Sequence, residues 1–147
     1  MPLKETLALD LKESMKSKDK VRKNVVTLIR AAIKQREVDE RVELKDADII
    51  DIIAKQVKQM KDSLVVFQKG NRQDLVDHTN EEIKILLDYL PPQLSNEELE
   101  QIVKESIQET KAQTKKDLGK LMAVIMPKVK GKADGKHVNQ IVAKYLQ

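Results

Sequence analysis

The sequence predicts an all-α protein, with an N-terminal bundle of about four helices followed by a smaller C-terminal module of three helices. Apolar residues recur at helical spacing along almost the whole chain, and the alternation typical of strands is nearly absent. Aromatic residues make up only 2% of the 147 residues, so the core must consist of Leu, Ile, Val, Met and Ala. Four glycines and four prolines leave little material for a turn-rich β fold.

Four apolar stripes predict the N-terminal helices. In each stripe the apolar residues lie three or four positions apart, which places them on one face of a helix. In chain order the stripes are Leu3, Leu7, Leu11 and Met15; Val21, Val25, Leu28, Ile29, Ala32 and Ile33; Ile49, Ile53, Val57, Met60, Leu64 and Phe67; and Val76, Ile83, Leu86, Leu87 and Leu90.

Charged residues and turn formers predict where these helices begin and end. The acid- and Arg-rich segment 37–43 is expected to be a loop, and Asp46 is expected to cap the long third helix. Gly70 is expected to stop that helix. Asn71 is the expected N-cap of the fourth helix, with Asp74 as its capping partner.

Two consecutive prolines, Pro91 and Pro92, predict the boundary between two domains. Proline has no backbone N–H and restricts the residue before it, so the fourth helix must end here. We therefore expect an N-terminal helical domain of residues 1–92 and a three-helix C-terminal domain of residues 93–147.

Capping signals predict the three C-terminal helices. The segments Ser95–Glu98 and Thr114–Asp117 each have the spacing of a capping box and should open the fifth and sixth helices. Pro127 should end or kink the sixth helix, and Asp134 can cap the seventh. The apolar residues of these helices are Leu99, Ile102, Val103 and Ile107; Leu118, Leu121, Met122 and Ile125; and Val138, Ile141, Val142 and Tyr145.

Composition excludes several classes of protein. Without cysteine, the chain has no disulfide scaffold, no thiol nucleophile and no cysteine-based metal site. Residues 1–20 are interrupted by charge every few positions, unlike a secretory signal. The longest apolar stretch, around residues 121–127, is far shorter than the ~20 residues that cross a membrane. These observations predict a cytoplasmic protein that is not inserted in a membrane.

No catalytic or metal site is expected from the sequence, and no cofactor. A Gly-x-Ser-x-Gly nucleophile motif is absent. His78 shares a helical face with Asp74, Glu81 and Glu82, which fits a solvated charged face better than a metal site that has one histidine. Asp62 and Asp74 could act as general acid and base only if the fold brought them together beside a substrate.

The segment from Gly131 to His137 is similar to a phosphate-binding loop but departs from it. It is one residue short, it follows a helix, and His137 stands where a magnesium-binding hydroxyl belongs. Nucleotide hydrolysis is therefore not expected. Two interpretations remain open: a helix start that receives a nucleic-acid phosphate, and a glycine-containing turn with solvated lysines.

Positive charge is concentrated near the C-terminus. Residues 1–92 hold 18 Lys and Arg against 17 Asp and Glu, whereas residues 111–144 hold nine lysines and two acids. Few aromatic residues accompany these lysines, so backbone contact with folded or duplex RNA is expected rather than base stacking, and DNA is not expected. The alternative is a solvated surface. The lysines expected to contact phosphate are Lys115, Lys116, Lys120, Lys128, Lys130, Lys132 and Lys136.

Several motifs resemble those of the YqeY proteins in the GatB/YqeY family, and the resemblance covers essentially the whole chain. In combination these motifs are specific. They are Asp10–Met15, Gly70–Leu75, Tyr89–Ser95, Asp117–Met122 and Lys130–Gly135.

The C-terminal part also resembles the tail domain of GatB, the tRNA-binding subunit of the glutamine-dependent tRNA amidotransferase. The shared pattern includes Gly119, Met122, Gly131 and Ala133, which we expect to shape helix packing and the turn. The resemblance implies contact with tRNA, and an association with carbon–nitrogen ligase activity that uses glutamine as amido donor. The chain lacks the large catalytic module of GatB, so the resemblance implies no autonomous activity.

Three functions remain open at this level. The first is a non-catalytic tRNA-binding accessory protein. The second is a helical adaptor that docks to an amidotransferase or another translation factor through its N-terminal helices. The third, with the least support, is an autonomous amidotransferase, for which neither a nucleophile nor an ATP site is visible.

Overall fold

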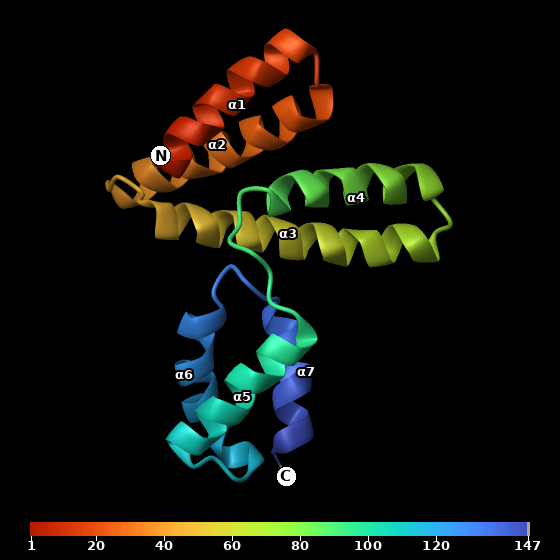
Figure 1. Cartoon of the computed structure of the whole chain (residues 1–147). Coiled ribbons are helices and arrows are strands. Elements are labelled where there is room, and N and C mark those ends of the chain that lie inside the picture. Colours follow the sequence, from red (N-terminus) through yellow and green to blue (C-terminus); the bar gives the residue numbers. More distant parts are fainter. Residues whose placement is uncertain (147) are drawn as a thin grey trace. The chain divides into compact units, whose positions relative to one another are not determined.

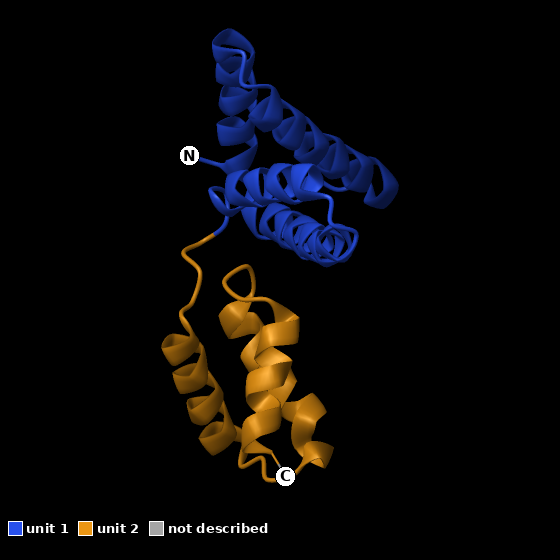
Figure 2. Ribbon diagram, turned by 90° about the vertical axis from the view of Figure 1, so that its right-hand side faces the viewer, with its two compact units in different colours: residues 1–90 blue, residues 91–147 orange. Residues whose placement is uncertain are grey.

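The computed structural model describes residues 1–146, which form seven α-helices, one short 3-10 helix and no strand (Figure 1). The predicted all-α fold is confirmed. The helices form two compact units, which Figure 2 shows in different colours. Unit 1 comprises residues 1–90, and unit 2 begins at Pro91.

Unit 1 consists of two helical hairpins. Helix α1 (Leu3–Ser17) packs beside α2 (Lys20–Glu40), and α3 (Asp46–Lys69) packs beside α4 (Gln73–Leu87) (Figure 1). Helix α2 also contacts α3 and α4, which joins the hairpins around one core. The buried apolar residues of this core are Leu7, Val25, Val26, Ile29, Ile33, Leu44, Ile49, Ile53, Val57, Ile83, Ile85, Leu86 and Tyr89.

Two residues predicted to lie in the apolar stripes of unit 1 are largely outside the core. Met15 is 56% exposed and Leu28 is 54% exposed, whereas Ser14 is buried. Position 14 lies three turns from Leu3 on the same side of α1, and position 15 is rotated by one further residue. The Ser14 hydroxyl is satisfied inside the unit, because it donates to the Asp10 carbonyl at 2.6 Å.

The predicted loop over residues 37–43 is wrong for its first half. Helix α2 continues to Glu40, and Arg41 ends it in the left-handed conformation. The bond from Arg36 Nε to Glu40 Oε2, 2.8 Å long, supports the last turn. Charged residues thus extend this helix because their side chains bond to one another at i and i+4.

The predicted caps of α3 and α4 are also wrong. Lys45 is the N-cap of α3, and Asp46 instead accepts a bond from the Leu3 N–H at 3.0 Å, at the start of α1. Asn71 has φ 54°, a left-handed conformation that asparagine tolerates, and it reverses the chain after α3. Arg72 is the N-cap of α4, and its guanidinium bonds both carboxylate oxygens of Asp74.

Unit 2 consists of three helices and one 3-10 turn. Helix α5 (Asn96–Thr110) packs against both α6 (Leu118–Val129) and α7 (Gly135–Tyr145), and η1 (Lys115–Asp117) leads directly into α6. The buried residues of its core are Leu99, Val103, Ala112, Leu121, Ile125, Val129, Val138, Ile141, Val142 and Leu146.

The predicted caps of unit 2 are confirmed. Ser95 and Glu98 form the reciprocal capping box of α5, with bonds of 3.2 and 3.3 Å. The box from Thr114 to Asp117 opens η1 rather than α6 itself. Asp134 caps α7 by accepting from the Lys136 N–H at 3.1 Å. Pro127 lies inside the last turn of α6, which ends two residues later.

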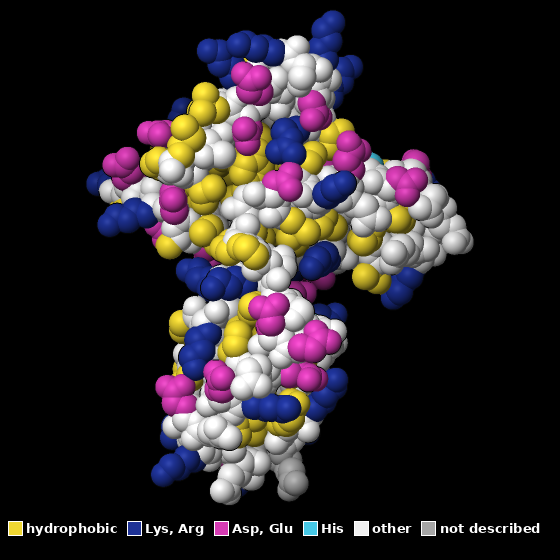
Figure 3. Space-filling model, in the orientation of Figure 1, with side chains coloured by type: hydrophobic (Ala, Val, Ile, Leu, Met, Phe, Trp, Pro, Cys, Tyr) yellow, Lys and Arg dark blue, Asp and Glu magenta, His cyan; other side chains and the backbone are white. Residues whose placement is uncertain are grey.

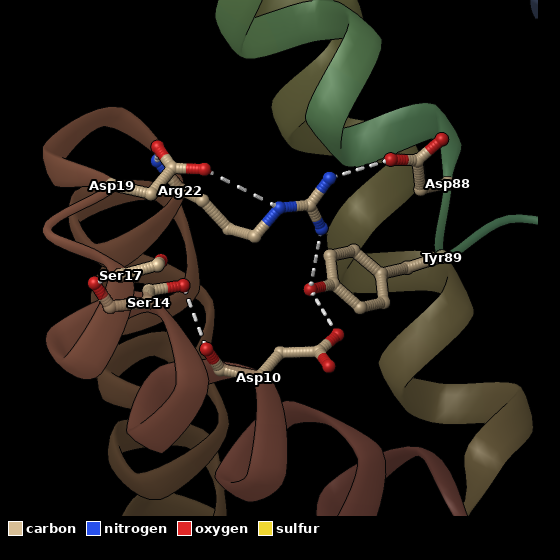
Figure 4. A network of polar contacts seen from close by, with 7 residues as sticks. All are labelled: Asp10, Ser14, Ser17, Asp19, Arg22, Asp88 and Tyr89. Carbon is tan, nitrogen blue, oxygen red and sulfur yellow. Dashed lines mark hydrogen bonds and ion pairs between the residues drawn. The ribbon is translucent and has the colours of Figure 1, made fainter.

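A polar network around Tyr89 joins three segments of unit 1 (Figure 4). The buried Tyr89 hydroxyl donates to Asp10 of α1 at 2.6 Å and accepts from Arg22 of α2 at 3.1 Å. Arg22 also donates to Asp88 at 2.8 Å, and its guanidinium lies 5.9 Å from the centre of the Tyr89 ring. The network fixes the chain segment that follows α4 against the first hairpin.

We expect the substitution Y89F to lower the free energy of unfolding by about 1–2 kcal/mol, because Asp10 and Arg22 each lose a hydrogen-bond partner but keep access to water. Urea unfolding followed by circular dichroism measures this change. The matched control is Y145F, which alters an exposed tyrosine of unit 2.

The same network predicts how stability depends on alkaline pH. Burial and then the bond to Asp10 raise the pKa of Tyr89 from 10.0 to about 12, so the folded chain favours the neutral phenol. Its contribution is complete below about pH 10 and is lost between about pH 10 and 12, where only the unfolded chain ionises. Over this range the parent protein should lose more stability than Y89F. Parallel pH profiles of the two proteins would contradict this account.

Candidate nucleic-acid interface

The structure divides the seven predicted lysines between two regions of unit 2. Lys115, Lys116 and Lys120 lie in η1 and the first turn of α6, and the other four lie at its far end and beyond. All seven side chains are exposed. Lys120 and Lys130 are ten residues apart, roughly 15 Å along a helix. The lysines therefore form an extended arrangement rather than one cluster around a single phosphate.

The first group remains available to a ligand. None of its lysines forms an ion pair with a residue that the structure describes. The neighbouring Asp117 carboxylate accepts bonds from the backbone N–H groups of Gln113 and Thr114 at 3.0 and 3.3 Å. These bonds, with a smaller contribution from Lys120, lower the pKa of Asp117. Asp117 is thus ionised and held as a cap.

Lys128 differs from the other six lysines because the fold partly neutralises it. Its Nζ lies 3.0 Å from Glu109 Oε2 and 3.3 Å from the Ser106 hydroxyl, both on α5. Its first role is therefore to join α6 to α5.

The loop after α6 is held in place by the segment that precedes α5. The Gly131 carbonyl accepts from Gln93 Nε2 at 2.8 Å, and the Lys132 carbonyl accepts from the Leu94 N–H at 2.9 Å. Gly131 is buried with φ 74°, a conformation that strains other residues. The turn therefore needs its glycine, and it presents Lys130 and Lys132 to solvent from an anchored backbone.

The start of α7 is not an open phosphate site. The Asp134 carboxylate bonds the Lys136 N–H and therefore occupies the position that an anion would take at this helix end. His137, the next residue, lies 2.6 Å from the Asn96 side chain. A phosphate contact in this region would have to come from the Lys136 side chain rather than from the helix amides.

An uncharged face of α6 connects the two lysine groups, and the sequence analysis did not identify it. Gly119, Ala123 and Met126 are exposed and share one side of the helix by spacing. A Cβ added to Gly119 would meet no described atom within 4 Å, so this glycine does not serve packing as expected. Lys115 precedes this row and Lys130 follows it. We call this surface the outer face of α6.

The acids of unit 2 are mostly on a different helix. Helix α5 carries five glutamates against a single lysine, and acidic side chains gather over it in Figure 3. An RNA backbone would be repelled there and attracted to the segment from η1 to α7. The five glutamates are Glu97, Glu98, Glu100, Glu105 and Glu109.

The other candidate groups do not assemble into a site in residues 1–146. His78 approaches only Glu82, at 3.6 Å, and this part of the chain holds no group of three or more potential metal ligands. Arg72 lowers the pKa of Asp74 through their hydrogen bonds, which makes Asp74 a weak base. No helix within these residues is long and apolar enough to cross a membrane.

Comparison with known proteins identifies relatives in fungi and archaea. The chain is 36% identical over 108 residues to altered inheritance of mitochondria protein 41 of Kluyveromyces lactis, covering 71% of this chain and 58% of the relative. It is 28% identical to the protein of that name from Pyrenophora tritici-repentis, over 91% of this chain and 75% of the relative. The chain thus spans somewhat over half the length of the Kluyveromyces protein.

A third relative connects the chain with tRNA amidotransferases. It is one of the subunits of the glutamyl-tRNA(Gln) amidotransferase from Thermococcus sibiricus. The two sequences are 47% identical over 49 residues, which cover 33% of this chain and 8% of the archaeal protein. This local match supports the relation to the tail domain of GatB.

The cytoplasmic location predicted from the sequence is contradicted by these relatives, because the fungal proteins are named as mitochondrial. The argument failed for a physical reason. An apolar N-terminal segment marks secretion, whereas mitochondrial targeting segments are amphipathic and basic, so the absence of the first says nothing about the second.

A family profile described as "Yqey-like protein" matches residues 4–146, across both units. The motifs at Tyr89–Ser95 and Asp117–Met122 lie within this match. The chain therefore belongs to the YqeY-like family.

Proposed function

We propose that unit 2 binds tRNA through the outer face of α6 and the lysines at its two ends, and that the protein acts as a non-catalytic accessory of tRNA-dependent amidation. One observation carries this proposal. An exposed, uncharged helix face, which includes a glycine with open space around it, lies between two groups of lysines. Such a surface lets a sugar–phosphate backbone approach closely while cations on either side contact its phosphates.

The chemistry favours recognition of the RNA backbone. Phosphate contacts by lysine gain free energy from counterion release and carry no sequence information. The only aromatic residue described in unit 2 is Tyr145, whose ring lies 5.8 Å from Lys104 Nζ of α5. Without aromatic platforms beside the lysines, recognition by base stacking has no support, and the shape of a folded RNA is the feature to be read.

The name of the archaeal relative supports tRNA as the class of RNA. That protein is part of an enzyme that acts on glutamyl-tRNA(Gln), and it shares 49 aligned residues with this chain. The match covers a small part of that protein, so the shared element supports binding of tRNA rather than the amidation step.

The triple substitution K115A/K116A/K120A tests the first lysine group. We expect weaker tRNA binding and a salt dependence of log Kd that is shallower by about three, roughly one for each lysine withdrawn from a phosphate. A filter-binding titration across salt concentrations measures both quantities. The matched control is K58A/K61A/K84A, which removes three exposed lysines from unit 1. Equal slopes for the parent and K115A/K116A/K120A would remove this group from the interface.

The two lysines near the end of α6 should differ in their effects. K130A should reduce the salt slope by about one, whereas K128A should reduce it less, because Glu109 already neutralises Lys128. The same titration compares the two single variants. A larger loss from K128A than from K130A would show that the ion pair with Glu109 opens when RNA binds.

The substitution G119A separates stability from binding. Alanine should raise the free energy of unfolding by about 0.5–1 kcal/mol, because glycine disfavours helix and the added Cβ has open space. The same change should weaken tRNA binding several-fold, and G119L should weaken it further, by holding the RNA backbone away from α6. Thermal unfolding and filter binding give the two values. If both variants bind tRNA like the parent, α6 does not contact it through this face.

A further inference from the structure

A cleft of about 620 Å³ lies between α1 and α2 of unit 1, far along the sequence from the lysines of unit 2. Its floor includes Leu7 and Ile33, which are buried core residues. Its walls carry cationic side chains from both helices. Lys4 comes from α1, and Arg30 and Lys34 come from α2.

The charges in this cleft do not cancel. Lys4 is bonded to Glu37, which also accepts from the Leu44 N–H at 2.8 Å. These two bonds, the one from Lys4 first, lower the pKa of Glu37 and keep it ionised. Arg30 and Lys34 have no ion pair with a described residue, so they leave the cleft with a surplus of positive charge.

An apolar row runs along the exposed side of α2 beside the cleft. Leu28 is 54% exposed and Val38 is 64% exposed, and Ala31, which lines the cleft, is exposed between them. The spacing of these residues places them on one side of the helix, away from the core residues Val26 and Ile29. Helix α2 is thus apolar on two sides, although only one side is buried within unit 1.

We infer that this surface, formed by the cleft and the exposed row of α2, binds an acidic amphipathic helix of a partner protein. Apolar side chains of that helix would cover Leu28, Ala31 and Val38. Acidic side chains beside them would pair with Arg30 and Lys34, which are four residues apart, or about 6 Å along α2. Helix binding in a groove commonly combines these two contacts.

Other occupants fit this surface less well. An RNA backbone would leave the apolar row uncovered, and no aromatic residue lines the cleft for a base to stack on. A second copy of the chain, docked by a two-fold axis, would bring Arg30 and Lys34 of both copies together and repel. The inference concerns unit 1 and does not depend on tRNA binding by unit 2.

The test uses the full chain and a synthetic helical peptide of about 18 residues, with leucines at i, i+3, i+7 and i+10 and glutamates flanking them. Heteronuclear NMR of the labelled protein follows the titration and detects weak complexes. We expect saturable shifts confined to α1 and α2 around Lys4 and the segment 27–38, with none in unit 2. A scrambled peptide of the same composition should produce no saturation.

Two charge variants make the result decisive. R30A/K34A should weaken peptide binding about tenfold or more, and the control K58A/K61A, with the same change of charge on α3, should bind within about twofold of the parent. Circular dichroism checks that both remain folded. No saturation, equal binding of the scrambled peptide, or equal binding by R30A/K34A would overturn the inference. So would concentration-dependent shifts of the same residues without peptide, which would identify a second copy as the occupant.

Discussion

Burial of one apolar face on each helix holds both units together, and the composition leaves the chain no other means. It has no disulfide and three aromatic residues, so Leu, Ile and Val fill both cores. Each small unit needs every such face it can bury. Helices α2 and α6 are therefore notable because each exposes further apolar surface outside the core, beside cations that form no ion pair with a described residue. Packing of the isolated chain does not explain it, whereas contact with a macromolecule does.

The lysines of unit 2 show how folding sorts charges that look equivalent in the sequence. Glu109 engages Lys128, and backbone amides engage the carboxylates of Asp117 and Asp134. The two acids nearest the lysines in sequence are thereby used as caps. The remaining cations lie on an anchored loop and at two helix ends, where an extended polyanion can reach several at once.

Local signals predicted the helices of unit 2 well. Ser95 with Glu98, and Asp134 with Lys136, bond across two or three residues, so each cap depends on its own segment alone. Predictions failed where a distant residue competes. Asp46 was expected to cap α3, but it accepts from Leu3 of another helix. Asn71 was expected to open α4, but the turn between two packed helices needs its left-handed backbone.

The sequence alone determined the all-α class, the seven helices and the family, because helical periodicity, capping residues and motifs are properties of short segments. Only the tertiary structure decided which surfaces remain open. It separated the C-terminal lysines into two groups, left open space around Gly119 within the described part of the chain, and brought Asp10, Arg22 and Tyr89 into one network. These features join residues up to 79 positions apart, and such contacts depend on how whole helices pack rather than on any local pattern.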